Sequence, residues 1–387
     1  MKSPEVLIIE GHVQGLSNLR AVSALGAHAW VIDKKKCIAS HSKHCHYFAI
    51  CPDFNTPAFI DFLIDFAEKH EIKNCLILPS NDHIVINIAN NKSRLTPYFL
   101  LPGYDAKVID TICDKGKLLK VAESVQVPIP NTAFFNRHED AQETTLTFPV
   151  LTKGRYGLTF YKKVGKKALI AFDKKDLIGD LHFIEQMLPL SETFTQEVIP
   201  SSLQNKTVSY AAFAVEGEIK AYWMGEKLRE HPITFGTATL AISVHHETCH
   251  DQSVRLLRAL NYTGICEIEY LRDLRDNQYK LIEINPRTWL WVGLARECGV
   301  DFAGLLLKHA QGKPTEHSFG FEKGVMWYNP FTDPVYSLVA IIKGKLSPLT
   351  YFKTLFHSRK TNAFFAQGDL KPGFAYFFNL LSFLKHR

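Results

Sequence analysis

Residues 264–287 read GICEIEYLRDLRDNQYKLIEINPR, and this stretch decides the fold that we expect for the second half of the chain. Apolar and polar residues alternate on both sides of residues 273–277, which are typical of a turn. The pattern predicts an antiparallel hairpin, in which residues two apart share one face of the sheet. One face then gathers the following acidic and amide side chains: Glu267, Glu269, Glu283 and Asn285.

This cluster of side chains predicts a magnesium site. Clustered carboxylates repel one another unless a cation neutralises them, and carboxylate and amide oxygens suit Mg²⁺ better than zinc. We expect an ion that also bridges nucleotide phosphates. Pro286 ends the second strand, and the guanidinium of Arg287 follows within reach of phosphate oxygens. The alternative is the solvated acidic face of an ordinary hairpin.

Three upstream segments favour a nucleotide site over that alternative. Lys153 ends an apolar strand directly before a loop containing glycine, an arrangement in which backbone N–H groups and an ammonium cradle a polyphosphate. Lys115 begins a predicted helix. Residues 196–199 form a polar strand followed by Pro200, which suits hydrogen bonding to a flat base.

The first part of the chain has a different pattern. Apolar runs over residues 5–9 and 29–32 flank a helical pattern over residues 16–25, which predicts a βαβ unit and a parallel sheet. The turn over residues 11–15 lacks the GxGxxG spacing, so a Rossmann oxidoreductase is a distant alternative. Downstream of Lys153, the residue pattern predicts further strands over residues 158–161, 168–172 and 219–223.

Composition narrows the classes of protein. A chain of 387 residues that is 46% hydrophobic is long enough for two or three domains. Its net charge of +6 is spread along the sequence, so we expect no nucleic-acid partner. Eight cysteines without a CxxC pair and no signal-peptide core predict a cytoplasmic protein, and no apolar run is long enough for a transmembrane segment. Histidine clusters at residues 41–46 and 245–250 lack the spacing of structural zinc sites.

Taken in order, these motifs resemble the ATP-grasp superfamily. The chain is most similar there to the carboxylate–amine ligases of the D-aspartate ligase and carbamoyl-phosphate-synthase-like type. The segments that carry the resemblance are GHVQG at 11–15, DK at 114–115, VPIP at 127–130, FPVLTK at 148–153, QEVIP at 196–200, KLREHP at 227–232 and EINPRTW at 283–289.

The resemblance implies a mixed α/β and α+β fold in four parts. A Rossmann-like pre-ATP-grasp domain would span residues 1–112. The two lobes of the ATP-grasp would span residues 113–190 and 191–320, and an aromatic-rich extension would cover residues 321–387. For this extension we expect helices packed over the grasp, the alternative being an amphipathic surface for peripheral membrane contact.

The resemblance also implies roles for individual residues, with ATP and Mg²⁺ as cofactors and Mn²⁺ as a substitute metal. Lys227 and Arg229 would hold the γ-phosphate, and Arg287 would complete the catalytic set. The residues implied to bind ATP are Lys115 and Lys153 at the phosphates, Gln196 at the adenine amino group, and the backbones of Glu197 and Ile199 at the adenine. The implied metal ligands are Glu269, Glu283 and Asn285.

Two departures from the superfamily pattern affect these assignments. Members often carry an acid after the hinge to hold the ribose, but residues 201–205 are neutral here and Gln204 is the sole candidate. Some ligases place an arginine two residues before the first metal carboxylate to stabilise an oxyanion, and Glu267 stands there in this chain. The oxyanion role would pass to Arg287 or be absent.

The implied activity is ligation of a small-molecule carboxylate to an amine, through an acyl phosphate and with release of ADP. Such a site needs lysines, an arginine and magnesium, but no nucleophilic side chain. The alternatives are a thiol or bicarbonate acceptor, or a nucleotide-binding protein without turnover. Dimers are common among soluble enzymes, so a homodimer is one possible assembly, but the sequence does not fix the oligomeric state.

Overall fold

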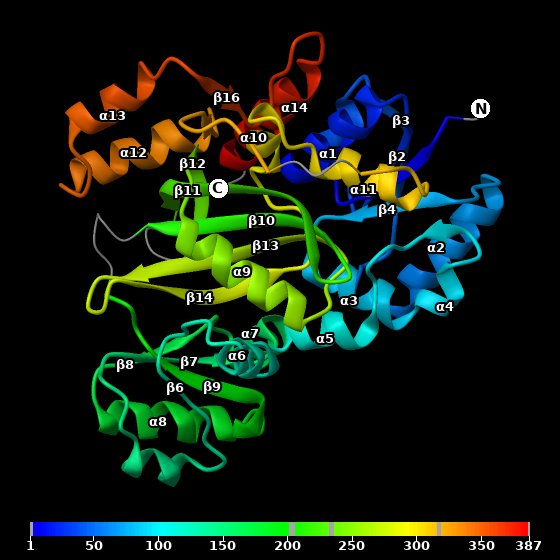
Figure 1. Ribbon diagram of the computed structural model, residues 1–387. Coiled ribbons are helices and arrows are strands. Elements are labelled where there is room, and N and C mark those ends of the chain that lie inside the picture. The colour runs from blue at the N-terminus through cyan, green and yellow to red at the C-terminus, as the bar shows by residue number, and fades with distance from the viewer. Residues whose placement is uncertain (1–2, 201–205, 232–235, 316–318, 386–387) are drawn as a thin grey trace.

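The computed structural model describes residues 3–200, 206–231, 236–315 and 319–385. Within these ranges the chain forms three sheets, which Figure 1 shows as separate layers. A parallel sheet near the N-terminus lies beside a large mixed sheet, and a small antiparallel sheet lies below the large one (Figure 1). The expected mixed α/β architecture is confirmed.

The first sheet is parallel, with the strand order β3-β2-β1-β4-β5. The order reverses between β1 and β4, so the carboxyl ends of these two strands border a crevice of the kind where doubly wound sheets bind ligands. The side chain of Asn81 caps α3 there by accepting a hydrogen bond from the amide of Ile84. The elements are β1 (Glu5–Ile9), α1 (Val13–Ala24), β2 (His28–Asp33), β3 (Cys45–Ile50), α2 (Pro57–Lys69), β4 (Cys75–Pro79), α3 (Asp82–Asn90), α4 (Lys92–Leu95), β5 (Phe99–Leu100) and α5 (Ala106–Cys113).

The second sheet is antiparallel, has the order β6-β9-β7-β8, and packs on α8 around a hydrophobic core of its own. The prediction of a strand over residues 158–161 is wrong, because α7 covers them. Phe160 and Val164, four residues apart, are the buried side chains of this segment, and Gly165 ends the helix at a φ of 76°. The elements are β6 (Thr132–Ala133), β7 (Val150–Gly154), α7 (Gly157–Val164), β8 (Leu169–Ala171), α8 (Lys174–Glu185) and β9 (Thr193–Glu197). The preceding helix α6 (Lys115–Ser124) packs instead on the third sheet through Leu118 and Ala122.

The third sheet has the order β14-β13-β10-β11-β12-β15-β16. The hairpin predicted over residues 264–285 is confirmed as β13 and β14, while β11 extends eight residues beyond the predicted strand end at residue 223. Two short strands of the C-terminal part, β15 and β16, join this sheet instead of lying over it. The elements are β10 (Thr207–Val215), β11 (Glu218–His231), β12 (Thr237–Ser243), α9 (Glu247–Ala259), β13 (Gly264–Asp273), β14 (Gln278–Asn285), α10 (Val292–Glu297), α11 (Phe302–Ala310), β15 (Met326–Tyr328) and β16 (Lys360–Asn362).

One continuous hydrophobic core joins the first and third sheets. It contains Ile8 of β1, Phe213 of β10, Trp223 of β11 and Phe302 of α11, all fully or almost fully buried. Polar contacts cross the same junction, since the hydroxyl oxygen of Thr288 accepts hydrogen bonds from the side-chain amides of both Gln14 and Asn18. The first and third sheets therefore form one body, and the second sheet with its separate core forms another.

The C-terminal part adds three helices, α12 (Thr332–Ile342), α13 (Pro348–Leu355) and α14 (Lys371–Lys385), which lie above the large sheet in Figure 1. Its Trp327 and Phe364 are buried in the shared core, but both lie outside the helices that were expected to pack over the grasp. Helices α12 and α13 leave most of their apolar side chains exposed. In the described residues we find no helix with the length and hydropathy needed to cross a membrane.

Candidate active site

The hairpin brings its four polar side chains together by strand register. Glu267 lies opposite Asn285, and Glu269 lies opposite Glu283. The amide nitrogen of Asn285 donates a hydrogen bond to Glu267 at 3.0 Å, which ties the first of these pairs. The grouping predicted from the period of two is therefore present.

These side chains line a cleft between the second and the third sheet. The cleft encloses about 1050 Å³, including the part open to solvent. Lys153 enters it from β7 of the small sheet, and Lys227 enters it from β11 of the large sheet. Cations from two different sheets therefore line the same cleft as the acidic hairpin.

Two lysines neutralise the two glutamates that were predicted to bind metal. The ammonium of Lys115 lies 2.6 Å from Glu283, and that of Lys227 lies 2.9 and 3.1 Å from the two oxygens of Glu269. The charge of Lys115 holds the pKa of Glu283 well below its usual range. Burial lowers the pKa of Lys227, but the charges of Glu269 and Glu267 outweigh this effect and raise the pKa above its usual value. Glu283 is therefore charged at neutral pH.

Lys153 is the cation that the cleft holds least firmly in its charged form. Burial, and then the neighbouring charge of Lys115, lower the pKa of Lys153 to about 8. A polyphosphate placed beside this ammonium would supply the negative charge that favours protonation. The donor set of the cleft, oxygens on the hairpin and ammonium groups opposite, therefore fits both Mg²⁺ and nucleotide phosphates.

Glu267 acts through its neighbours. It is 3% exposed and accepts a hydrogen bond from the hydroxyl of Ser209 at 2.7 Å in addition to the one from Asn285. Burial and the nearby charge of Glu269 raise the pKa of Glu267. Because the side-chain nitrogen of Asn285 donates its hydrogen bond to Glu267, the side-chain oxygen of Asn285 points away from Glu267. This oxygen accepts a hydrogen bond from Arg287.

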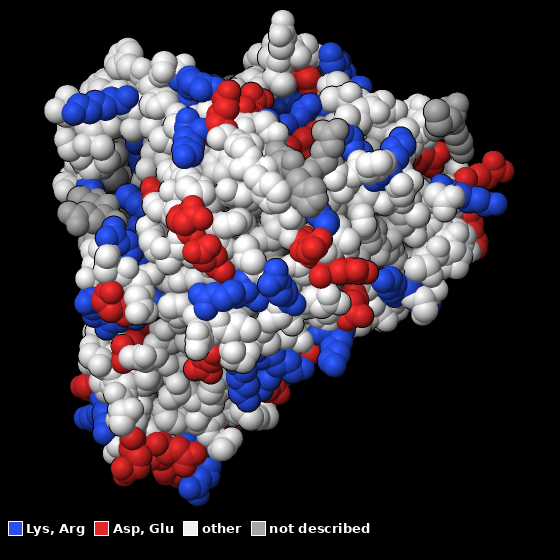
Figure 2. Space-filling model, viewed as in Figure 1, with Lys and Arg blue, Asp and Glu red and all other residues white. Residues whose placement is uncertain are grey.

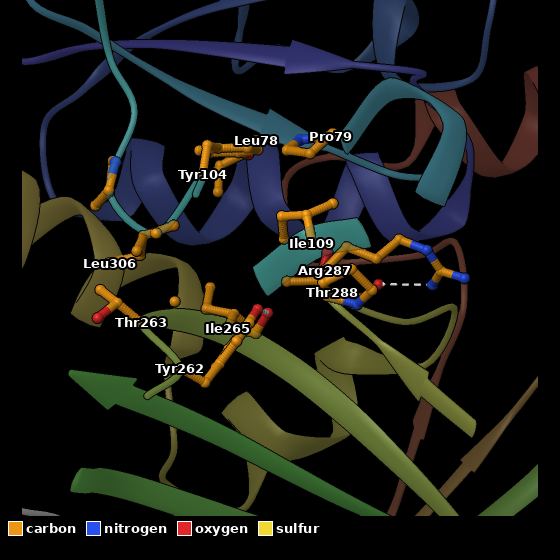
Figure 3. Close-up of a pocket in the computed structure, with 14 residues that line it drawn as sticks. Leu78, Pro79, Tyr104, Ile109, Tyr262, Thr263, Ile265, Arg287, Thr288 and Leu306 are labelled. Atoms are coloured by element: carbon orange, nitrogen blue, oxygen red, sulfur yellow. Dashed lines mark hydrogen bonds between the residues drawn. The ribbon is translucent and has the colours of Figure 1, made fainter. Parts of the chain in front are cut away.

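Arg287 connects the cleft to the first sheet. Its guanidinium donates to Asp82 at the start of α3 at 2.8 Å, to the carbonyl oxygen of Thr288 at 3.0 Å and to Asn285 at 3.2 Å. It also borders a second, smaller pocket of about 380 Å³ between β4, α5 and the start of β13, and Figure 3 shows its contact with Thr288 there. Leu78, Ile109 and Tyr262 are among the apolar side chains that surround that pocket (Figure 3).

Asp82 and Ser209 are two site residues that the sequence analysis missed. Asp82 follows the buried strand β4 at the carboxyl edge of a parallel sheet, which is a general signal for a ligand-facing residue. Ser209 lies in an apolar strand, and nothing in the local sequence distinguishes it. Its role becomes visible only because β10 pairs with β13, which sets Ser209 opposite Glu269 and beside Glu267.

The hinge residues lie at the end of β9. The side-chain amide of Gln196 donates to the hydroxyl of Thr132 at 2.9 Å. The carboxylate of Glu197 accepts from the side chain of Asn131 at 3.0 Å and the backbone of Thr147 at 2.9 Å, so this side chain is engaged within the protein. The adenine contacts assigned to Gln196, Glu197 and the buried Ile199 stay predictions, and Gln204 lies outside the described residues.

Arg229 is not brought into the cleft, in contrast to the prediction. Its guanidinium makes a two-point contact with Asp333 of α12, at 2.8 and 2.6 Å, and a further hydrogen bond with Thr354 of α13 at 3.0 Å. The physical reason is an irregularity in the pairing of β11 with β12 between residues 227 and 229. The two side chains therefore do not share a face, although they are two residues apart.

The parallel sheet, the two facing sheets and the cleft between them define a protein with the ATP-grasp fold. Known structures agree. N5-carboxyaminoimidazole synthetase from Staphylococcus aureus superposes with a TM-score of 0.65 and 17% identity, over 84% of this chain and 82% of that one. An L-amino acid ligase from Bacillus licheniformis gives 0.60 and 15%, over 80% and 75%.

Sequence comparison extends this result. Residues 234–318 match the family model described as the carbamoyl-phosphate synthase L chain, ATP binding domain. The chain is also similar to the D-aspartate ligase of Enterococcus faecium (strain Aus0004), with 25% identity over 253 residues. That match spans 62% of this chain and 60% of the ligase. The resemblance to ATP-grasp ligases expected from the motifs is confirmed.

Proposed function

We propose that the chain is an ATP- and Mg²⁺-dependent ligase that joins a carboxylate to an amine. The observation that carries the proposal is the pairing of Glu269 and Glu283 across one hairpin, in a cleft that Lys153 and Lys227 also line and with Lys115 bound to Glu283. The similarity to a D-aspartate ligase supports an amine as the acceptor.

In the proposed reaction, an oxygen of the substrate carboxylate attacks the γ-phosphorus of ATP. The bond from that phosphorus to the bridging oxygen breaks, which releases ADP and leaves an acyl phosphate. The amine then attacks the carbonyl carbon, phosphate leaves with the bonding electrons, and the nitrogen loses a proton to give an amide. Each step needs alignment and charge neutralisation more than a nucleophile from the protein.

The residues of the cleft divide this work. Glu269, Glu283 and Asn285 would hold Mg²⁺, which neutralises phosphate charge and fixes the orientation of the γ-phosphate. Lys115, Lys153 and Lys227 would contact phosphate oxygens once nucleotide replaces their present partners. Arg287 lies between the cleft and the first sheet, a position suited to the carboxylate or to the oxyanion formed from it.

The first experiment is an assay of ADP release with Mg·ATP, a panel of D- and L-amino acids and small carboxylates, and hydroxylamine as a general amine. We expect release that depends on one carboxylate and yields a hydroxamate. Substituting Glu283→Gln should reduce the rate by at least about a thousandfold, since it removes a charged ligand at the transferring phosphate. The matched control is Glu226→Gln, because Glu226 pairs with His246 outside the cleft.

Other results of this assay would replace the proposal. Release that requires bicarbonate or a thiol instead of an amine would assign another acceptor to the same fold. ATP binding without ADP release under any condition would indicate a nucleotide-binding protein without turnover. Equal loss of activity in the Glu283→Gln and Glu226→Gln variants would contradict a specific role of Glu283 in ADP release.

A further inference from the structure

Helix α12 presents its apolar stripe to solvent. Val335, Leu338, Val339 and Ile342 follow the spacing i, i+3, i+4, i+7 and are 56%, 58%, 42% and 76% exposed. The buried face of the same helix carries polar residues, Asp333 and Ser337. An ordinary surface helix has the opposite arrangement, with its apolar stripe against the core.

Helix α13 continues this apolar surface. None of its residues is buried, and Leu349, Phe352, Leu355 and the following Phe356 are exposed. Both helices lie together at one corner of the molecule, in orange at the upper left of Figure 1. We call the exposed apolar side chains of both helices the α12–α13 surface. Exposed apolar side chains that gather on one face of a protein mark sites that contact a partner or a membrane.

The charged side chains of the segment that forms the α12–α13 surface are positive after Asp333. No Asp or Glu occurs in the sequence from residue 334 to residue 368. Lys343 and Lys345 lie exposed at the turn between the helices, and Lys353 lies exposed on α13. In Figure 2 the corresponding corner is white and blue. The long lysine stems can lie along an apolar surface while their charges reach outward.

We propose that the α12–α13 surface docks the protein on an anionic lipid bilayer. Apolar side chains would enter the boundary between headgroups and acyl chains, and the lysines would pair with the negative headgroups. The alternative occupant, a second copy in a symmetric dimer, would bring these lysines against one another. Charge complementarity therefore favours the anionic membrane.

The α12–α13 surface is fixed to the body that carries the cleft. Asp333 of α12 and Thr354 of α13 both contact Arg229 of β11, two residues after Lys227. Asp333 is also held by the hydroxyl of Thr239 at 3.0 Å. Docking would therefore place the large sheet, and with it the cleft, at a defined orientation to the membrane.

The test is flotation of the full chain with vesicles of phosphatidylcholine alone or with 30% phosphatidylglycerol. We expect co-flotation with the anionic vesicles, at least tenfold weaker binding without phosphatidylglycerol, and weakening by salt. Leu338→Glu and Ile342→Glu should abolish binding, and Lys343→Glu with Lys345→Glu should weaken it at least tenfold. Phe172→Glu is the matched control, because Phe172 is 72% exposed on the small sheet's side of the molecule.

Three results would overturn the proposal. The full chain could fail to float with either vesicle, or it could bind both vesicles equally well. Alternatively, light scattering could show a dimer that Ile342→Glu converts to monomer in a chain that binds no vesicles, which would assign the surface to a second copy. All substituted side chains are exposed, so thermal unfolding should match that of the unsubstituted protein and confirm that each variant is folded.

Discussion

At the scale of single residues, the cleft balances its charges before any nucleotide binds. Lys115 contacts the carboxylate of Glu283, and Lys227 contacts that of Glu269. The two ammonium groups therefore bind the same carboxylates that would bind a metal ion. Binding of Mg·ATP would exchange these contacts, giving the carboxylates to the metal and the lysines to the phosphates. Because charged groups are neutralised in both states, the cleft avoids burying unpaired charge.

Lys153 should make nucleotide binding depend on pH. Its pKa of about 8 in the free protein lies below the value it would have beside phosphates, so ATP binding above pH 8 should take up a proton. We expect affinity to fall by up to about tenfold per pH unit above pH 8. Isothermal titration calorimetry in buffers of different ionisation enthalpy measures the proton uptake. Lys153→Arg keeps the charge and should remove the dependence; an unchanged profile in this variant would contradict the assignment.

Glu267 should give the metal-free protein a pH-dependent stability. Its pKa is raised in the folded state, so between the unfolded and folded values the native state binds more protons. Its contribution to the free energy of unfolding therefore falls as pH rises through that window. Glu267→Gln should flatten this slope in urea unfolding series with EDTA at pH 5 to 8. Glu226→Gln is the control, and identical slopes in the Glu267→Gln variant and the unsubstituted protein would refute the prediction.

The grouping of Glu269, Glu283 and Asn285 on one face of the hairpin could be predicted from the sequence, because it depends only on the local geometry of two paired strands. A strand fixes residues two apart on one face, and a hairpin sets the two strands opposite each other. The partners of Arg287 and Glu267 could not be predicted in that way, since Asp82 and Ser209 reach them through tertiary packing. Arg229 was wrongly expected beside Lys227 in the cleft. In a regular strand these two side chains would share a face, but the irregular pairing of β11 with β12 between them changes the direction of Arg229.

At the scale of elements, β11 is the strand on which the large sheet depends. It pairs with β10 and β12 and continues through the polar run of Lys227, Arg229 and Glu230, which in isolation is typical of a loop. Pairing with β10 ends at Glu226, but β12 pairs with this run as far as His231, so the strand persists where propensity alone would end it. The strand carries both a cleft lysine and the anchor of α12.

Gly225 tests how tightly β11 packs. A methyl group at this position would overlap the rings of Trp223 and Trp291 in the shared core. We expect Gly225→Ala to lower the free energy of unfolding by about 1–3 kcal/mol through overpacking. Gly179→Ala is the matched control, because Gly179 lies exposed in α8 with open space around it. That change should stabilise by about 0.5–1 kcal/mol. Urea unfolding measures both, and equal effects would contradict the packing argument.

At the scale of the whole molecule, the chain consists of two bodies with separate cores. The core of the small sheet is built from residues 135–190, whereas the core shared by the first and third sheets runs from Val6 to Phe364. Local opening costs less free energy where fewer buried contacts hold an element. The small sheet is therefore the part expected to move over the cleft when nucleotide binds.

Hydrogen exchange should separate the two bodies. We expect amides of β7 and β9 to exchange faster than those of β10 and β11 in the free protein, because they open with the smaller core. Mg·ATP should slow exchange in β7 by at least about tenfold through contacts at Lys153, and slow β1 much less. Mass spectrometry of peptides from these strands provides the measurement. If the amides of all four strands exchanged at the same rate in the free protein, the two bodies would unfold as one cooperative unit and the prediction would be wrong.

The parallel sheet and the hairpin were predictable because buried strands and alternating strands leave clear patterns in the sequence. The joining of β15 and β16 to the large sheet was not, because each strand has three residues and finds its partner only in the folded chain. The exposed stripe of α12 was equally hidden. Its spacing predicts a helix with one apolar face, but not which way that face points.

The continuous core has a consequence for anyone who wishes to build chimeras from this chain. Exchanging the first sheet for that of a relative would divide the core that contains Ile8, Trp223 and Phe302, and would separate Thr288 from Gln14 and Asn18. A graft that keeps its stability would have to carry α10, α11 and the buried Phe364 with the transplanted sheet. The small sheet has a core of its own and is tied to the rest of the chain by polar contacts such as that of Arg155 with Asp114, so it is the more natural unit for recombination.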